Sequence, residues 1–222
     1  AHRYGNGCRD ISSRVAQDAM ALHAALVSAR LRAILADSGA SISVRRWSRT
    51  TGEVKVVDVP VSVPVTLNIR DWSVRLRPEM LQIAYMMRAQ YLPNETGGVL
   101  VGLIDRTHKT ISVLDALPAP PDSDAWPTSF IRGSAGLRAT VERFAKRTLG
   151  NLVYVGEWHS HPNGYSTEPS KLDVAAIFQC APHAHADGIP ALMMIVGKDE
   201  FGLTLLPQGA AKIHFAAQSS KP

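Results

Sequence analysis

From Ser73 onwards, short strand-like and helix-like segments alternate, and this alternation constrains the fold more than any other feature of the chain. Strands are predicted at 73–77, 98–104, 110–117, 152–158, 190–197 and 201–206. Helices are predicted at 78–91, 134–148 and 170–179. Residues 162–169 are predicted to form a loop. We therefore expect a compact α/β fold in this part of the chain.

Two segments within this region have distinctive patterns. In the helix at 78–91, a proline suits the first turn and an apolar face is predicted from Met80, Ile83, Ala84 and Met87. Residues 118–129 are rich in proline and are predicted to form a loop. Trp126 in this loop is a candidate either for clamping the tail of a partner or for anchoring the loop itself.

Composition excludes several classes of protein. The 222 residues are 45% hydrophobic and 19% charged, which is typical of a globular chain and not of a disordered one. No apolar run approaches the ~20 residues of a membrane span, and no signal peptide is recognised. The two cysteines, Cys8 and Cys180, exclude a disulfide scaffold and favour a reducing, cytoplasmic setting. The first residue, Ala1, is not a methionine, so we expect a fragment of a longer chain.

The net charge of +5 is confined to the first fifty residues, which hold eight arginines and three aspartates. The remaining residues hold sixteen basic and sixteen acidic side chains and are neutral. No basic stripe with interleaved aromatic residues occurs in that part, so a nucleic-acid partner is not expected. The early arginines are interpreted as a solvated or partner-facing surface.

The first part of the chain has a different pattern from the rest. Residues 10–36 carry apolar side chains at steps of three and four, which predicts a helix. Residues 41–47 and 53–59 alternate between apolar and polar, with a Thr-Gly turn between them, which predicts a β-hairpin. Prolines then interrupt 60–72, which is expected to be an edge strand or a connection. We place the domain boundary here, with 1–70 as one part and 71–222 as the other.

The strongest chemical signal is the pair His159 and His161 at the end of a predicted strand. Side chains two apart on a strand point to the same side, so both imidazoles can bind one metal ion. Asp173 follows His161 by twelve residues, just inside the next predicted helix, and a Pro/Gly turn can fold that helix start over the strand end. Two imidazoles and a carboxylate suit Zn²⁺ with a water as fourth ligand, and zinc lowers the pKa of such a water to about 7.

A hydrolytic site of this kind also needs a proton carrier. Glu95 is the first candidate, because it lies at a helix-to-strand junction where small residues allow a close approach to the metal pocket. Glu157 is the alternative, because it shares strand parity with His159 and His161. Parity alone does not separate the two candidates.

Together, Glu95, His159-Ser-His161-Pro and Ser170-x-x-Asp173 resemble the JAMM (MPN-plus) zinc metalloprotease motif, in its bacterial JAB-type version. The resemblance covers about residues 73–207. It implies a mixed α/β sheet flanked by helices, related to the cytidine deaminases, with a short helix and hairpin before it. It also implies zinc bound by His159, His161 and Asp173, Glu95 as general acid and base, and Ser170 as a donor to the oxyanion. Eight residues separate His161 from Ser170 where the usual pattern has seven, so Ser166 is kept as an alternative to Ser170.

Members of this family cleave isopeptide or peptide bonds after the C-terminal Gly-Gly of ubiquitin-like proteins. The resemblance therefore implies a hydrolase with a ubiquitin-like substrate, in maturation or in deconjugation, within a bacterial antiviral conjugation system. The alternative is a non-catalytic MPN-type scaffold that binds partners related to E1, E2 or ubiquitin. A zinc deaminase is disfavoured, because its His-x-Glu and Pro-Cys-x-x-Cys motifs do not occur.

Residues 1–70 resemble the C-terminal end of ThiF-type, E1-like adenylating domains, through Gly7-Cys8-Arg9-Asp10, the alanine-rich helix and the hairpin. This resemblance implies that an ATP-binding part precedes Ala1. Cys8 is interpreted as structural rather than as a thioester or redox cysteine.

A second His-x-His, His183-Ala-His185, is predicted in a loop after the helix at 170–179, where we interpret both residues as surface histidines rather than as a second metal site. Cys180 is expected to pack at the end of that helix.

Overall fold

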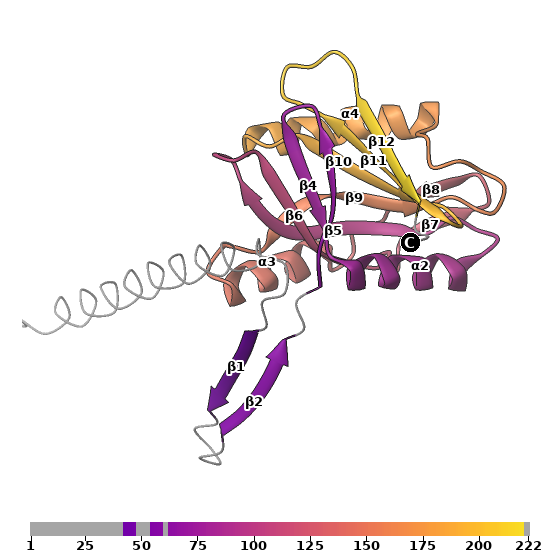
Figure 1. Cartoon of the computed structure of the whole chain (residues 1–222). Helices are drawn as coiled ribbons and strands as arrows, with labels where there is room; N and C mark the ends of the chain where they lie inside the picture. The colour runs from indigo at the N-terminus through magenta and orange to yellow at the C-terminus, as the bar shows by residue number, and fades with distance from the viewer. Residues whose placement is uncertain (1–41, 48–53, 60–61, 220–222) are drawn as a thin grey trace, which may run out of the picture. The chain divides into compact units, whose positions relative to one another are not determined.

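The computed structural model describes residues 42–47, 54–59 and 62–219, and the chain divides into two compact units between Val63 and Pro64 (Figure 1). In the first unit, β1 (Ile42–Trp47) pairs antiparallel with β2 (Val54–Val59). The two strands of the predicted hairpin are thus present. The helix predicted at 10–36 lies outside the described residues, and so does Cys8. The unit boundary falls before residue 70, because the strand that follows Pro64 belongs to the large sheet of the second unit.

An eight-stranded sheet organises the second unit, in the order β12-β11-β10-β9-β5-β6-β4-β3. Only β4–β6 and β9–β10 pair in parallel among these strands, so the sheet is mixed. Its strands are β3 (Val65–Ile69), β4 (Trp72–Leu76), β5 (Gly97–Asp105), β6 (Thr110–Ala116), β9 (Val153–Ser160), β10 (Ala191–Val196), β11 (Glu200–Leu206) and β12 (His214–Ser219). The helices are α2 (Pro78–Tyr91), α3 (Leu137–Arg147) and α4 (Lys171–Ala186). The predicted class, a mixed α/β sheet flanked by helices, is confirmed.

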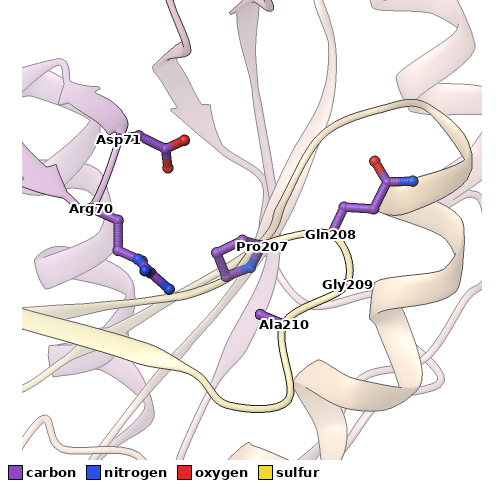
Figure 2. Close-up of a pocket in the computed structure, with 6 residues that line it drawn as sticks. All are labelled: Arg70, Asp71, Pro207, Gln208, Gly209 and Ala210. Carbon is purple, nitrogen blue, oxygen red and sulfur yellow. The ribbon is translucent and has the colours of Figure 1, made fainter.

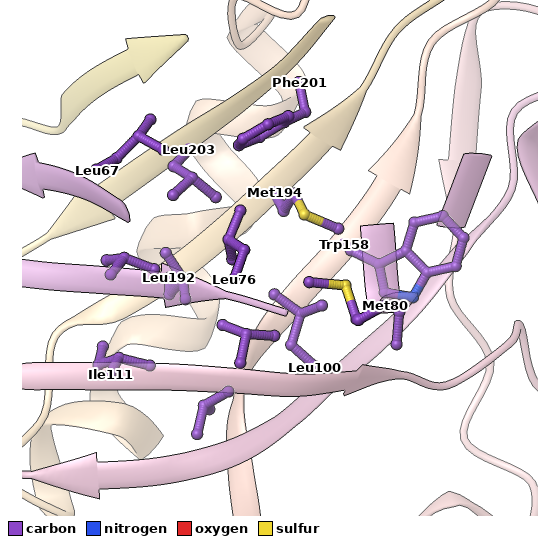
Figure 3. Packing of buried hydrophobic residues seen from close by; sticks show 14 of the residues in the cluster. Leu67, Leu76, Met80, Leu100, Ile111, Trp158, Leu192, Met194, Phe201 and Leu203 are labelled. Atoms are coloured by element: carbon purple, nitrogen blue, oxygen red, sulfur yellow. The ribbon is translucent and has the colours of Figure 1, made fainter. Parts of the chain in front are cut away.

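The helices cover opposite faces of the sheet, as the alternation along β10 shows. Met194 and Val196 pack in the largest apolar cluster, together with α2 residues such as Met80, whereas Met193 and Ile195 pack with α4. Trp158 on β9 and Leu100 on β5 belong to the α2 side, where Figure 3 shows them beside Met80. Residues of α3 pack against the opposite side of β5. Because side chains alternate along a strand, the neighbours of Trp158 on β9 face α3 and α4.

The edges of the sheet approach one another, because Arg70 after β3 and His214 on β12 lie 3.1 Å apart between Nη1 and Nε2. Twisted strands curl a sheet of this width in this way. Within the described ranges, no helix is long and apolar enough to cross a membrane.

Several local predictions were wrong. The helix expected at 170–179 continues to Ala186, through Pro182, and the loop expected at 118–129 contains β7 (Asp124–Trp126), which pairs with β8 (Ser129–Ile131). The final strand, β12, was not predicted. On α2, Ile83 is exposed, and Leu81 and Arg88 take its expected place on the buried face. The apolar pattern was ambiguous there because the helix has apolar side chains all round.

The contact between β5 and β9 is closest at Gly97, which lies opposite His159 in the antiparallel register. A Cβ atom at residue 97 would overlap the carbonyl oxygen of Trp158 and lie 2.6 Å from Cε1 of Phe130 and 2.9 Å from Cβ of His159. Glycine is therefore required here by the close approach of backbone to backbone, and not by its own dihedral angles.

We expect Gly97→Ala to destabilise the protein by about 1–3 kcal/mol, because the added methyl overpacks the β5–β9 contact. Urea unfolding followed by circular dichroism measures the change. Asn68→Ala, at an exposed position on the edge strand β3, serves as the control and should change stability by no more than about 0.5 kcal/mol. A Gly97→Ala protein as stable as the wild type would show that the two strands do not meet this closely.

Candidate metal centre

His159 and His161 lie at the end of β9, on the side of the sheet that α4 covers. Their imidazole Nε2 atoms are 3.3 Å apart, and both residues are buried. The His161 N–H donates to the carbonyl of Val196 at 3.0 Å, which extends the pairing with β10 past the end of β9. The expectation that the two rings share one side of the strand is met.

Asp173 reaches the same point from the first turn of α4. Its Oδ1 lies 3.1 Å from Nε2 of His159, and its Oδ2 lies 3.6 Å from Nε2 of His161. Ser170 is the N-cap of α4 and exchanges hydrogen bonds with Asp173: the Ser170 N–H donates to Oδ2 at 2.7 Å, and the Asp173 N–H donates to the Ser170 hydroxyl at 3.3 Å. This capping box fixes the start of the helix and the carboxylate together.

The donor atoms of His159, His161 and Asp173 all lie within 4.8 Å of one another, the one such group among the residues that the structure describes. Two imidazole nitrogens and one carboxylate oxygen are a donor set that zinc prefers, and three protein ligands leave a position open. The residues therefore fit the metal that the sequence motif implies.

Glu95 lies beside this cluster, two residues before β5. Its N–H donates to the carbonyl of Trp126 at 2.9 Å, and Thr96 next to it exchanges two hydrogen bonds with Ser160, at 2.7 and 3.1 Å. Glu95 is only 7% exposed. Burial raises the pKa of its carboxyl, and the nearby imidazoles of His159 and His161 partly oppose that rise. A buried carboxyl with a raised pKa is suited to carrying a proton.

His161 and Asp173 shift each other's pKa values. Burial alone lowers the pKa of His161, but hydrogen bonds to Asp173 and to the Ser166 carbonyl outweigh it, so the pKa is raised. Burial would raise the pKa of Asp173, but its hydrogen bonds to His159 and His161 hold the pKa below the usual range of an aspartate. Asp173 is thus ionised over the whole neutral range and keeps its negative charge there.

Glu157 has other partners. Both of its carboxylate oxygens accept hydrogen bonds from the Arg132 guanidinium, at 2.6 and 3.1 Å, and Oε1 also accepts one from the Tyr154 hydroxyl at 2.9 Å. Burial raises the pKa of Glu157 despite the charge of Arg132. With both oxygens engaged, Glu157 is less suited than Glu95 to exchange protons with a substrate.

Arg88, which the sequence did not single out, and the backbone of Ser166 hold His161 in place. The buried Arg88 of α2 donates to the His161 carbonyl and to Oδ1 of Asn163, each at 2.8 Å. The Ser166 carbonyl lies 2.6 Å from Nδ1 of His161. Ser166 thus contacts the site through its backbone. The burial of Arg88 could have been predicted, since it follows Ala84 by four residues on the buried face of α2. The contact of the Ser166 carbonyl could not, because a backbone carbonyl leaves no pattern in the sequence.

Two cavities lie in the second unit. One, of about 490 Å³, lies between α3 and α4 and is lined by Glu157 and Arg132 together with apolar side chains such as Val99, Leu137 and Val141. The other, of about 580 Å³, lies between the β3–β4 turn and the loop after β11, and Figure 2 shows the six residues that line it. Its only carboxylate, Asp71, is paired with Lys109, and none of its residues belongs to the metal cluster. No residue of the cluster lines the first cavity either, but its Glu157 is close enough to His159 for the imidazole to act on the pKa of the carboxyl.

The sequence model for prokaryotic homologs of the JAB domain matches residues 77–205. That range is more than half of the chain and holds Glu95, Ser170 and all three residues of the cluster. The chain belongs to the prokaryotic JAB family. The bacterial JAB-type assignment made from the motif is thereby confirmed.

This JAB domain is also similar to individual proteins. It is 37% identical over 125 residues to a protein named CD-NTase/cGAS isopeptidase from Enterobacter hormaechei, a match that covers 54% of this chain and 67% of that relative. A solution structure of a protein from Desulfitobacterium hafniense matches with a TM-score of 0.45 and 20% identity, over 65% of this chain and 88% of the other. A likeness that weak carries no further conclusion.

The second His-x-His does not lie in a loop, contrary to expectation. His183 and His185 are on α4, where residues two apart point to different sides of the helix. Nε2 of His185 is 3.1 Å from the carbonyl of Leu206, and His183 is exposed. Cys180 lies within α4 rather than at its end, and is partly buried. The surface interpretation of His183 is consistent with this placement.

The shifted pKa values of Asp173 and His161 predict how the stability of the metal-free JAB domain depends on pH. Asp173 has a lowered folded pKa, so its contribution to stability is present above pH ~4 and is lost as the pH falls. His161 has a raised folded pKa, so its contribution is present below pH ~6.5 and is lost as the pH rises through the folded value. Asp173→Asn should therefore cost about 1–3 kcal/mol between these limits and less at higher pH.

Urea unfolding of chelator-treated protein at several pH values measures this difference. Asp71→Asn, which removes an exposed partner of Lys109, is the control and should leave the stability almost unchanged throughout. A difference for Asp173→Asn that stays constant from pH 5 to pH 9 would mean that the carboxylate acts only as a helix cap.

Proposed function

We propose that this JAB domain is a zinc-dependent isopeptidase that cleaves after the C-terminal Gly-Gly of a ubiquitin-like protein. The observation that carries the proposal is the convergence of His159, His161 and Asp173 beside the buried carboxyl of Glu95. The isopeptidase name of the 37% identical relative supports the reaction class. The family resemblance supports the substrate class and a role in bacterial antiviral defence, in the cytoplasm.

In this proposal, His159, His161 and Asp173 hold the zinc ion. Bound zinc would polarise the scissile carbonyl and make a water acidic enough to attack at neutral pH. Glu95 takes the proton of the attacking water and returns it to the leaving amine of lysine. The raised pKa of Glu95 suits both steps, since a carboxyl must accept and then release the proton near neutral pH.

Ser170 is the proposed donor to the oxyanion. Its hydroxyl oxygen accepts the Asp173 N–H, and a hydroxyl that accepts a hydrogen bond still has its own hydrogen to donate. Ser170 is exposed at the start of α4, so a substrate carbonyl can approach it. Ser166 is the weaker choice, because the group that it directs at His161 is its carbonyl, which cannot donate a hydrogen bond.

The cavity between α3 and α4 supports a peptide-like substrate. It adjoins Glu157, two residues before His159 on the same side of β9, and its walls are mainly apolar. An extended tail that places its last residue at the metal could therefore place an earlier apolar side chain in this cavity. Whether the task is maturation or deconjugation depends on the group attached beyond the Gly-Gly.

We further propose that residues 1–70 are the C-terminal part of an E1-like adenylating domain. The β1–β2 hairpin and the separate compact unit that ends at Val63 support this assignment. E1-like and E2-like proteins would then be partners of the full-length chain in conjugation, with the JAB domain acting on the product or on the precursor.

The purified wild-type protein should contain about one zinc ion per chain. His159→Ala/His161→Ala should lose it, because two of three ligands are removed, while circular dichroism shows that the fold is retained. His183→Ala/His185→Ala is the matched control and should keep its zinc. Elemental analysis decides: folded wild type that neither contains nor takes up zinc would refute the metal assignment.

Glu95→Gln should lower kcat/KM by about 10²–10⁴ while zinc remains bound, because the general base is not a zinc ligand. The substrate is a ubiquitin-like protein joined through its C-terminal Gly-Gly to a lysine side chain. Asp173→Ala should instead lower the affinity for zinc. Glu157→Gln should lower kcat/KM less than Glu95→Gln does, because Glu157 is bonded to Arg132. If Glu95→Gln turns over almost normally while Glu157→Gln is inactive with zinc retained, Glu157 is the base. If the wild type itself is inactive, the alternative of a non-catalytic binding scaffold is favoured.

A further inference from the structure

The loop between β9 and α4, residues 162–169, has one deeply buried anchor in its second half. Asn163, Gly164, Tyr165, Ser166 and Glu168 are all exposed, whereas Thr167 is only 1% exposed. A buried threonine between exposed neighbours needs a hydrogen-bond partner for its hydroxyl. The loop joins His161 to Asp173, so whatever holds Thr167 also affects two of the proposed zinc ligands.

Glu200, the first residue of β11, supplies that partner. Its Oε1 accepts the Thr167 N–H at 3.2 Å and the Thr167 hydroxyl at 3.0 Å. Two glycines make room for the residue: a Cβ at Gly197 would lie 2.8 Å from Cγ2 of Thr167, and a Cβ at Gly202 would lie 2.7 Å from the Thr167 carbonyl oxygen. Thr167 therefore occupies a fitted notch at the β10–β11 turn, which we call the Thr167 notch (Gly197, Glu200 and Gly202).

The residue before Thr167 contacts the site. The Ser166 carbonyl lies 2.6 Å from Nδ1 of His161, so the neutral ring donates Nδ1–H to it and leaves Nε2 as the bare nitrogen. Nε2 is the atom that faces His159 and Asp173. The peptide that joins Ser166 to Thr167 is planar, so a bond that fixes the Thr167 N–H also fixes the direction of the Ser166 carbonyl.

We propose that Thr167 and Glu200 are positioning residues for His161: by anchoring the Ser166 carbonyl, they select the imidazole tautomer whose Nε2 can bind zinc. This inference rests on the proposed function for the identity of the metal. Arg88 does not duplicate the effect, because it contacts the His161 backbone carbonyl and not the ring. Partners of this kind behind a ligating histidine typically change metal affinity by 10–100-fold.

The experiment compares four variants of the full chain. Glu200→Ala removes both hydrogen bonds to the notch, and Thr167→Val removes only that of the hydroxyl. Thr167→Ser and Glu200→Gln keep an equivalent donor and acceptor. Thr204→Val is the matched control, because Thr204 is a buried β11 threonine whose Oγ1 has no hydrogen-bond partner among the described residues. Zn²⁺ affinity is measured by competition with a chromophoric chelator, and the His161 tautomer by ring ¹⁵N shifts of the metal-free protein at a pH where the imidazole is neutral.

Glu200→Ala should weaken zinc binding about 10-fold and show a mixture of His161 tautomers, and Thr167→Val, which keeps the N–H bond, should have a smaller effect in the same direction. The two conservative variants and Thr204→Val should stay within about 3-fold of wild type, with the Nδ1–H tautomer retained. Unchanged zinc affinity and an unchanged tautomer in Glu200→Ala would overturn the inference, even if that variant is less stable, because Thr167 and Glu200 would then only pack the loop.

The tautomer separates this inference from the proposed function. If the wild type binds no zinc but Glu200→Ala changes the His161 tautomer, the metal assignment fails and the positioning role stands. If the wild type binds zinc and the variants bind it equally well with the same tautomer, the positioning role fails and the proposed function stands.

Discussion

The antiparallel pairing of β5 with β9 is the constraint on which the site depends. It sets Gly97 opposite His159 and leads the chain, through Thr96 and its two hydrogen bonds to Ser160, back to Glu95. A carboxylate more than sixty positions away in sequence is thereby held next to the histidines by backbone hydrogen bonds. Such bonds position a group more rigidly than a flexible side-chain contact, because the strands cannot slide without losing the whole register.

Placing ionisable groups in this position is costly to the fold. Burying a charge is unfavourable unless other groups compensate for it, and here each ionisable group has a partner: Asp173 with the two imidazoles, and Glu157 with Arg132. Glu95 is the exception: burial raises its pKa, as it raises that of Glu157, but within the described residues no hydrogen bond or ion pair engages its carboxylate. A buried acid without such a partner, beside a set of candidate metal ligands, is suited to proton transfer, which favours Glu95 over Glu157 for the proposed role.

The sequence predicted the elements whose patterns are strong and local. Apolar runs located β5, β6, β10 and β11, and the spacing of His159, His161 and Asp173 located the cluster. It failed where long-range packing decides: the helix predicted at 170–179 continues through Pro182 to Ala186, because Ala181 and Ala184 are buried against the sheet. The weakly apolar β12 gave no signal, and the supporting contacts of His161 could not be foreseen, because they run through backbone carbonyls and through Glu200, distant in the chain.

The connection from His161 to Ser170 shows how the site can tolerate variation in its own loop. Asp173 is placed by α4, whose buried residue Ile177 packs with Ile195 of β10, and His161 is placed by its hydrogen bond to Val196. β10 thus positions both residues, independently of the length of the loop between them. The extra residue relative to the usual motif can be accommodated among the exposed positions around Gly164, whose φ of +91° marks a turn that only glycine adopts easily. For the proposed positioning of His161, the loop must preserve only the Ser166–Thr167 peptide, whose carbonyl contacts the imidazole of His161.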